Sequence, residues 1–299
     1  MSGGEPAGAR AFQLVVVGAS AGGVEALLAL VASLPADFPA PIVLAQHLDP
    51  RRPSQLGSLL ANKSHLPVRT VTDIEHLEPG TIYVVPADRD VQITDHQVAV
   101  HGHTGTGSRP SIDHLLTTAA HRYGEELIAV ILTGTGSDGA AGAQAVKAYR
   151  GTVIIQNPET ARFPAMPQAV APAAVDIVAD LESIGPLLVD LLAGDFLLPH
   201  ADGDDLRPFL ERLREQTGLD FMAYKRLTIE RRLRRRMAAA GAETLADYRR
   251  YLDRHPDELQ RLVASFLIKV TEFFRDPEVF AYLRDQILPP LIAEARERG

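Results

Sequence analysis

Hydrophobic and polar positions follow two periodicities along the first two thirds of the chain. Short, uninterrupted runs of apolar residues predict strands buried on both faces, and segments with apolar positions three and four apart predict helices between them. This order of elements is typical of an α/β fold with a doubly wound, mostly parallel sheet. The predicted strands are 12–17, 41–47, 68–71, 81–85, 126–133, 152–156 and 175–178, with a hairpin at 90–94 and 97–101. The predicted helices are 24–34, 54–62, 111–123, 140–149, 166–170 and 181–192.

From residue 206 onward only helical spacing remains, which predicts a small all-α domain. Thr244 stands three residues before Asp247, the spacing of a capping box at the start of a helix. The predicted helices are 208–216, 221–240, one that opens at 244, 257–268 and 277–298. The apolar residues on one face of the second of these are Met222, Ile229, Leu233, Met237 and Ala240.

These patterns divide the chain into successive parts, because a polar stretch rich in Gly and Asp separates the two periodicities. The predicted parts are a flexible lead (1–11), an α/β domain (12–193), a linker (194–205), a helical domain (206–275) and the start of a further domain (276–299).

Charge separates the same regions. Residues 1–205 contain 11 Lys and Arg against 23 Asp and Glu, a net charge of −12, whereas residues 206–275 contain 16 against 10, a net charge of +6. Such asymmetry predicts two modules with different partners. The chain has no cysteine, which excludes disulfides and thiol chemistry. Without a signal peptide or an apolar run of ~20 residues, we expect a cytoplasmic protein with no membrane insertion.

The first predicted strand ends in a turn that carries one hydroxyl. Gly18-Ala-Ser-Ala-Gly22 matches the G-x-S-x-G pattern of a nucleophile elbow, between a strand and a helix. His47 ends the second strand and Asp138 follows strand 126–133, so all three polar groups should meet at the carboxyl edge of the sheet. There the histidine can take the proton of Ser20 and the aspartate can hold the imidazole. The glycines around Asp138 can offer backbone N–H groups to an oxyanion.

Each member of this triad also has an ordinary structural interpretation. A serine after a first strand often lies in a phosphate-binding turn, a lone histidine is often hydrogen-bonded in the core, and an aspartate in a glycine-rich loop often caps a helix. A dinucleotide-binding oxidoreductase is disfavoured because Ser20 stands where the fingerprint needs glycine and His47 stands where it needs an acidic residue. A metal site is not expected, because His101 and His103 have no third ligand at a suitable spacing.

The arginine-rich helix allows three interpretations: a solvated surface, a nucleic-acid site, or a docking face for an acidic helical partner. Nucleic-acid binding is disfavoured, because no aromatic residues are interleaved and the chain is acidic overall. The arginines are Arg231, Arg232, Arg234, Arg235 and Arg236.

Over about residues 12–193, the motifs resemble those of the CheB-type protein-glutamate methylesterases, in order and at the family's spacing. The resemblance implies that Ser20 is the nucleophile, His47 the base and Asp138 the orienting acid. It implies hydrolysis of glutamate γ-methyl esters, and deamidation of some glutamines, on chemoreceptor helices, without a cofactor. The motifs are Gly18-Ala-Ser-Ala-Gly-Gly23, Gln46-His-Leu-Asp49, Pro79-Gly-Thr-Ile-Tyr83 with Pro86, Ser111-Ile-Asp113, Leu132-Thr-Gly-Thr-Gly-Ser-Asp-Gly-Ala140 and Phe163-Pro-Ala-Met-Pro167.

Two positions depart from the pattern common in that family. Ala21 replaces a threonine, which removes a hydroxyl beside the nucleophile. Thr135 replaces a methionine whose backbone N–H resembles an oxyanion donor. With Gly136, these residues are the candidate oxyanion donors. The alternative to an esterase is a non-enzymatic sensory or scaffold module that retains the fold.

Segments 220–237 and 269–276 are similar to the N-terminal helical domain of CheR-type receptor methyltransferases. That resemblance implies that the arginines dock on receptor methylation helices and that Arg275 lies near an S-adenosylmethionine pocket. No glycine-rich cofactor loop follows residue 276. We therefore expect the front part of a CheB–CheR fusion, in which S-adenosylmethionine serves only the full-length methyltransferase.

Overall fold

The computed structural model of the chain describes residues 13–49, 51, 54–102, 109–193, 206–222, 224, 226–242 and 244–266. The sheet and the helices that follow it belong to one compact unit, Met1–Leu267.

A seven-stranded, entirely parallel sheet forms the centre of the first domain, in the order β10-β9-β8-β1-β2-β5-β3. The predicted doubly wound α/β fold is therefore confirmed. The strands are β1 (Leu14–Ala19), β2 (Ile42–Gln46), β3 (Val68–Thr70), β5 (Ile82–Val84), β8 (Leu127–Ile131), β9 (Thr152–Gln156) and β10 (Ile177–Ala179). The inner strands are buried along their whole length, which explains their uninterrupted apolar sequence.

The order in which successive strands are added to the sheet reverses at β1. The chain continues from β1 to β2 on one side and later returns to β8 on the other side. Ligands of doubly wound folds bind in the crevice at such a switch point, outside the carboxyl ends of the strands. The turns after β1, β2 and β8 therefore define the functional edge of this sheet.

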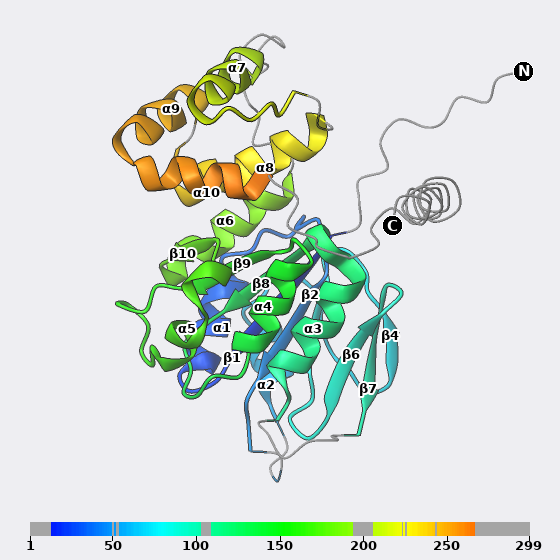
Figure 1. The fold of residues 1–299 in the computed structure, drawn as a ribbon. Coiled ribbons are helices and arrows are strands. Elements are labelled where there is room, and N and C mark those ends of the chain that lie inside the picture. Colours follow the sequence, from blue (N-terminus) through cyan, green and yellow to red (C-terminus); the bar gives the residue numbers. More distant parts are fainter. Residues whose placement is uncertain are drawn as a thin grey trace, which may run out of the picture. The chain divides into compact units, whose positions relative to one another are not determined.

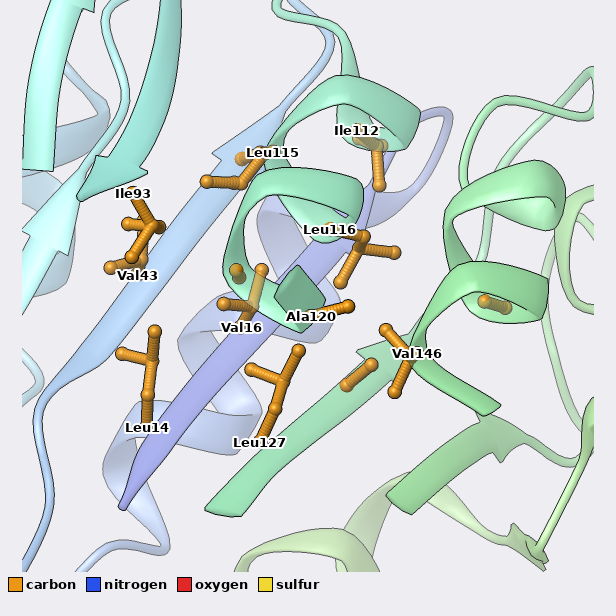
Figure 2. Close-up of a cluster of buried hydrophobic side chains, with 14 of the residues drawn as sticks. Leu14, Val16, Val43, Ile93, Ile112, Leu115, Leu116, Ala120, Leu127 and Val146 are labelled. Carbon is orange, nitrogen blue, oxygen red and sulfur yellow. The ribbon is translucent and has the colours of Figure 1, made fainter. Parts of the chain in front are cut away.

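Helices cover both faces of the sheet (Figure 1). Ile112, Leu115 and Leu116 of α3 pack against Leu14, Val16 and Leu127 of the sheet (Figure 2). The opposite face is covered by α1, α2 and α6, whose apolar residues form a second cluster with β1 and β2. The helices of this domain are α1 (Gly23–Ala32), α2 (Leu56–Ala61), α3 (Ile112–Tyr123), α4 (Ala140–Ala148), α5 (Ala165–Ala169) and α6 (Leu181–Ala193), with 3₁₀ turns η1 (Gly124–Glu126) and η2 (Pro172–Ala174).

A small antiparallel sheet of three strands, β4 (Ile74–His76), β6 (Asp90–Thr94) and β7 (Gln97–His101), lies beside α3. The hairpin of β6 and β7 was predicted from the sequence, but β4 was not. β4 has only three residues, and Ile74 is 60% exposed, so it carries no alternating apolar signal.

The described part of the second domain consists of four helices: α7 (Leu206–Thr217), α8 (Arg226–Ala239), α9 (Leu245–Arg254) and α10 (Pro256–Phe266). Ile229, Leu233 and Met237 enter its core, as predicted, but Met222 lies before α8 and is 39% exposed. Thr244 caps α9 and accepts a hydrogen bond from the N–H of Asp247, which confirms the predicted cap. Among the described residues, no helix is long and apolar enough to cross a membrane.

Candidate active site

Ser20 lies in the turn between β1 and α1. Its N–H donates to the carbonyl of Thr133 at 3.0 Å, and its carbonyl accepts the N–H of Gly23 at 2.8 Å. Gly22, with φ of +70°, takes the left-handed conformation that this sharp turn needs. Gly18 allows α3 to pack close to this end of β1, since a Cβ there would lie 2.5 Å from Ile112 Cγ2. The turn is therefore fixed by β1 on one side and by the segment after β8 on the other.

His47 and Asp138 meet at the same edge of the sheet. His47 follows β2, and its N–H donates to the carbonyl of Ala19, beside Ser20. The His47 Nε2 lies 2.8 Å from Asp138 Oδ2, and the two side chains are only 14% and 13% exposed. The structure thus brings together the predicted base and the predicted orienting acid, which are 91 residues apart.

The Asp138 carboxylate accepts two further hydrogen bonds, from the N–H groups of Ile112 to Oδ2 and Asp113 to Oδ1, each at 2.9 Å. Burial raises the pKa of Asp138, but the bonds from His47, Ile112 and Asp113 outweigh it and hold this pKa below its ordinary value. Asp138 is therefore ionised at neutral pH and can stabilise an imidazolium beside it.

The ring nitrogen that bonds to Asp138 determines the role of the other nitrogen. Because Nε2 faces the carboxylate, it carries the proton in the neutral imidazole, and Nδ1 is left with a lone pair. Within the described residues, no hydrogen bond joins Ser20 Oγ to the imidazole. Catalytic hydrogen bonds are often long in the absence of ligand and tighten in the complex. Nδ1 is thus the atom that can accept the proton of Ser20.

The candidate oxyanion donors belong to two turns: Ala21 follows Ser20 directly, and Thr135 and Gly136 follow Gly134, which lies against Ser20. Ala21 is half-buried, whereas Thr135 and Gly136 are exposed, and Gly136 has φ of +87°. Among the described residues, the N–H groups of these three residues donate to no other residue. Gly134 differs, because its N–H donates to the carbonyl of Phe163 at 2.9 Å.

Two buried glutamines form hydrogen bonds at the same edge of the sheet. Neither of them was assigned a role from the sequence. The Gln46 amide donates to the carbonyls of Ser20 and His47, at 2.7 and 2.9 Å, and so connects the two turns. Gln156 accepts the N–H of Thr133 at 2.8 Å. Each glutamine is the last residue of an apolar strand, and this polar terminal position is the signal that could have identified them.

A cavity of about 270 Å³ opens beside the segment that follows His47. Its lining is mostly apolar and comes from the starts of α1 and α2 and from the residues after β2. The described residues contain no group of three or more His, Cys, Asp or Glu that could hold a metal ion. The lining residues are Val24, Leu48, Asp49, Ser54, Gln55, Leu56 and Leu59.

The described arginines of α8 form contacts within the chain. Arg232 and Arg236 are buried; Arg232 donates to the carbonyl of Phe266 at 2.9 Å, and Arg236 pairs with Glu258. Arg235 donates to the carbonyls of Glu125 and Arg150, at 2.6 and 3.3 Å.

The remaining cationic candidates differ in how far they are described. Arg234 is 29% exposed and lies 3.8 Å from Glu230. The side chain of Arg231, and all of Arg275, lie outside the described residues.

Comparisons with known proteins find two matches along the chain. Residues 15–188 match the profile of the CheB methylesterase family, and residues 204–267 match that of the CheR methyltransferase all-alpha domain. The crystal structure of the Thermotoga maritima CheB methylesterase catalytic domain is similar, with a TM-score of 0.57 and 36% sequence identity. That match covers 61% of this chain and 100% of the Thermotoga chain.

Two curated relatives extend the comparison. An uncharacterised 104.1 kDa protein of Rhodobacter capsulatus is 32% identical over 269 residues, which are 80% of this chain and 28% of that protein. The protein-glutamate methylesterase/protein-glutamine glutaminase of Moorella thermoacetica is 36% identical over 190 residues, which are 61% of this chain and 45% of that protein. The chain therefore spans less than half the length of either relative.

Proposed function

Because this chain belongs to the CheB methylesterase family, we propose that it hydrolyses glutamate γ-methyl esters, and deamidates some glutamines, on the cytoplasmic helices of chemoreceptors. The observation that carries the proposal is the 2.8 Å bond from His47 Nε2 to Asp138, at the edge of the sheet where Ser20 ends β1. The relative from Moorella thermoacetica, a protein-glutamate methylesterase/protein-glutamine glutaminase, supports the same reaction.

The reaction begins with transfer of the Ser20 proton to His47 Nδ1 as Oγ attacks the ester carbonyl. Asp138 stabilises the imidazolium through Nε2 and keeps the ring in the required orientation. Negative charge develops on the carbonyl oxygen, and the N–H groups of Ala21, Thr135 and Gly136 are the candidate donors for it. One such donor is worth about 3–4 kcal/mol in a studied protease.

Collapse of the tetrahedral intermediate breaks the bond to the methoxy oxygen. His47 returns its proton to that oxygen, methanol leaves, and the glutamyl group remains on Ser20 as an ester. A water molecule then transfers a proton to Nδ1 and attacks this acyl-enzyme, which releases the glutamate side chain and restores Ser20. With glutamine as substrate the leaving group is ammonia.

The helical domain supports a chemoreceptor as the common partner. Residues 204–267 match the all-alpha domain of CheR methyltransferases, which implies S-adenosylmethionine as the cofactor of a full-length methyltransferase. The proposed cofactor contact, Arg275, lies outside the described residues, so no step is assigned to that cofactor. Docking on receptor methylation helices remains part of the proposal for Arg231, Arg234 and Arg235, whereas Arg232 and Arg236 are buried and so are not free to meet a partner.

Replacement of the nucleophile tests the proposed reaction. Methanol release from a methylated receptor fragment should fall to background in Ser20→Ala, while a Ser137→Ala control keeps wild-type release. Ser137 is an exposed serine of the neighbouring turn, and its one hydrogen bond among the described residues is the one that its backbone carbonyl accepts from the N–H of Ala140. Undiminished release by Ser20→Ala would overturn the proposal.

A serine-directed fluorophosphonate separates an esterase from a module that only retains the fold. We expect the probe to label Ser20 in the folded wild-type protein and to leave Ser20→Ala unlabelled. Absence of labelling in folded wild-type protein would favour the sensory or scaffold alternative.

A further inference from the structure

Two aspartates and two helix N-termini are bonded crosswise behind the imidazole. Asp138, in the turn before α4, accepts the N–H groups of Ile112 and Asp113 in the first turn of α3. In return, Asp113 Oδ1 accepts the N–H groups of Gly139 and Gly142 at the start of α4, at 2.9 and 2.6 Å. Each aspartate thus caps the helix that belongs to the other.

This exchange satisfies N–H groups that have no partner within their own helices. In α3, the side chain of the N-cap Ser111 accepts the N–H of His114, and Asp138 accepts the N–H groups of Ile112 and Asp113. In α4, the N-cap is Gly139, which has no side chain, so Asp113 replaces the missing cap. A carboxylate at a helix N-terminus is also favoured by the helix dipole.

The turn that carries Asp138 depends on this bond for its position. Residues 134–139 contain three glycines, and Gly136 and Gly139 have φ of +87° and +102°. Glycines lose more conformational entropy on ordering than other residues, so such a turn needs external contacts to hold one conformation. Asp113 accepts the N–H of Gly139, which directly follows Asp138, and the neighbouring Ile112 packs against Gly18 at the end of β1.

The pKa values of the two carboxylates are shifted in opposite directions, although both side chains belong to the same cluster. Burial raises the pKa of Asp113, as does the charge of Asp138, against the lowering effect of the N–H groups of Gly142 and Gly139. The pKa of Asp138 is lowered instead. Asp138, which faces His47, therefore holds its negative charge to lower pH than Asp113 does.

We propose that Asp113 is a positioning residue of the esterase: by holding the start of α4, it keeps the Asp138 carboxylate on His47 Nε2. This inference rests on the proposed function. Among the described residues, no hydrogen bond joins Asp113 to the imidazole, which is bonded to Asp138, so the effect of Asp113 on the reaction passes through Asp138.

Two substitutions separate this role from a general effect on folding. Asp113→Ala removes the acceptor and should lower kcat about 100-fold, the loss that a misplacement of about 1 Å produces, with KM little changed. Asp113→Asn keeps an oxygen acceptor for the N–H groups of Gly139 and Gly142 and should restore kcat to within about tenfold of the wild type. Rates are measured as methanol release per active site, with active sites counted by the fluorophosphonate.

Asp176 provides a matched control, because its carboxylate also accepts a backbone N–H, that of Val153 at 3.0 Å, and pairs with Lys147. Asp176 precedes β10 and so lies at the amino ends of the strands, whereas Ser20 follows the carboxyl end of β1. Asp176→Ala should lose stability in urea unfolding and keep its kcat per active site. Should Asp113→Ala fail to fold, Asp113→Glu keeps the charge but displaces the carboxylate, and its kcat should fall.

The outcomes distinguish this inference from the function on which it rests. Wild-type kcat in Asp113→Ala, or in Asp113→Glu where only that variant folds, would overturn the positioning role while an inactive Ser20→Ala leaves the esterase assignment intact. Failure of Asp113→Asn to recover activity would also overturn it. Full activity of Ser20→Ala would overturn the esterase assignment itself.

Discussion

Gly134 lies in the turn after β8, and a methyl group there would press against Ser20, the proposed nucleophile. A Cβ at this position would lie 2.8 Å from Ser20 Cβ and 2.6 Å from Met166 Sδ, whereas ordinary carbon contacts are about 3.5–4.0 Å. Met166 is 1% exposed, and the Gly134 N–H is bonded to Phe163, so neither side can yield freely. Overpacking of this kind costs about 1–3 kcal/mol of unfolding free energy.

We expect Gly134→Ala to lower kcat/KM for the methyl ester about 100-fold. The clash with Ser20 is about 1 Å deep, and a misplacement of about 1 Å costs roughly that factor. The corresponding loss of transition-state stabilisation is about 2.7 kcal/mol. Methanol release from a methylated receptor fragment measures the rate, and urea unfolding of the same preparation measures stability.

Gly151→Ala is the matched control. A Cβ at Gly151 would lie 2.6 Å from Val146 Cγ1 and 3.0 Å from the carbonyl of Leu127, but Gly151 precedes β9 and is thus at the other end of the sheet. It should lose a similar amount of stability and keep wild-type kcat/KM. Equal losses of kcat/KM in the two variants, or none in either, would refute the argument that Gly134 positions Ser20.

Two further substitutions test the site and the helical domain. Asp138→Asn should lower kcat by about four orders of magnitude, as loss of the correct histidine tautomer does in a serine protease. Because the folded-state pKa of Asp138 is lowered, its stabilising effect is complete above the ordinary value of about 3.9 and is lost as pH falls through the lowered pKa. The difference in unfolding free energy between wild type and Asp138→Asn should therefore become smaller only below about pH 4. A decrease of this difference between about pH 8 and pH 6 would contradict a pKa of Asp138 that is lowered by its hydrogen bonds. Glu258→Ala should cost about 3–5 kcal/mol in urea unfolding because it leaves the buried Arg236 unpaired, and Arg236→Met/Glu258→Leu should cost less; equal losses would contradict this account.

The edge of the sheet was predictable from the sequence because apolar runs mark where buried strands end. The run 12–17 predicts β1, and the polar residues that follow such runs predict which side chains gather at the carboxyl edge. Ser20, His47 and Asp138 were predicted in this way. The exchange between Asp113 and Asp138 was not, because hydrogen bonds between two helix starts depend on how α3 and α4 pack, which no local pattern encodes.

The same limit applies to the arginines of α8. Periodicity predicted that Ile229 and Leu233 face the core, and Arg232 and Arg236 each stand three residues after one of them, on the same face. Their partners, the Phe266 carbonyl and the Glu258 carboxylate, come 34 and 22 residues later. A charge run read by itself predicts a solvated face, since a buried guanidinium is stable only where distant acceptors meet it.

Their burial changes what a substitution in α8 can reveal about receptor docking. Removal of Arg236 leaves Glu258 buried without its cation, and that carboxylate also accepts the hydroxyl of Tyr248 at 2.8 Å. A buried charge that loses its partner destabilises the fold by several kcal/mol. Weaker receptor binding by an Arg236 variant would thus result from damage to the helical domain and would not identify a docking contact. Arg234 is more exposed than Arg236 and lies farther from its partner, Glu230, at 3.8 Å, so its substitution damages the fold less and is the cleaner measure of docking.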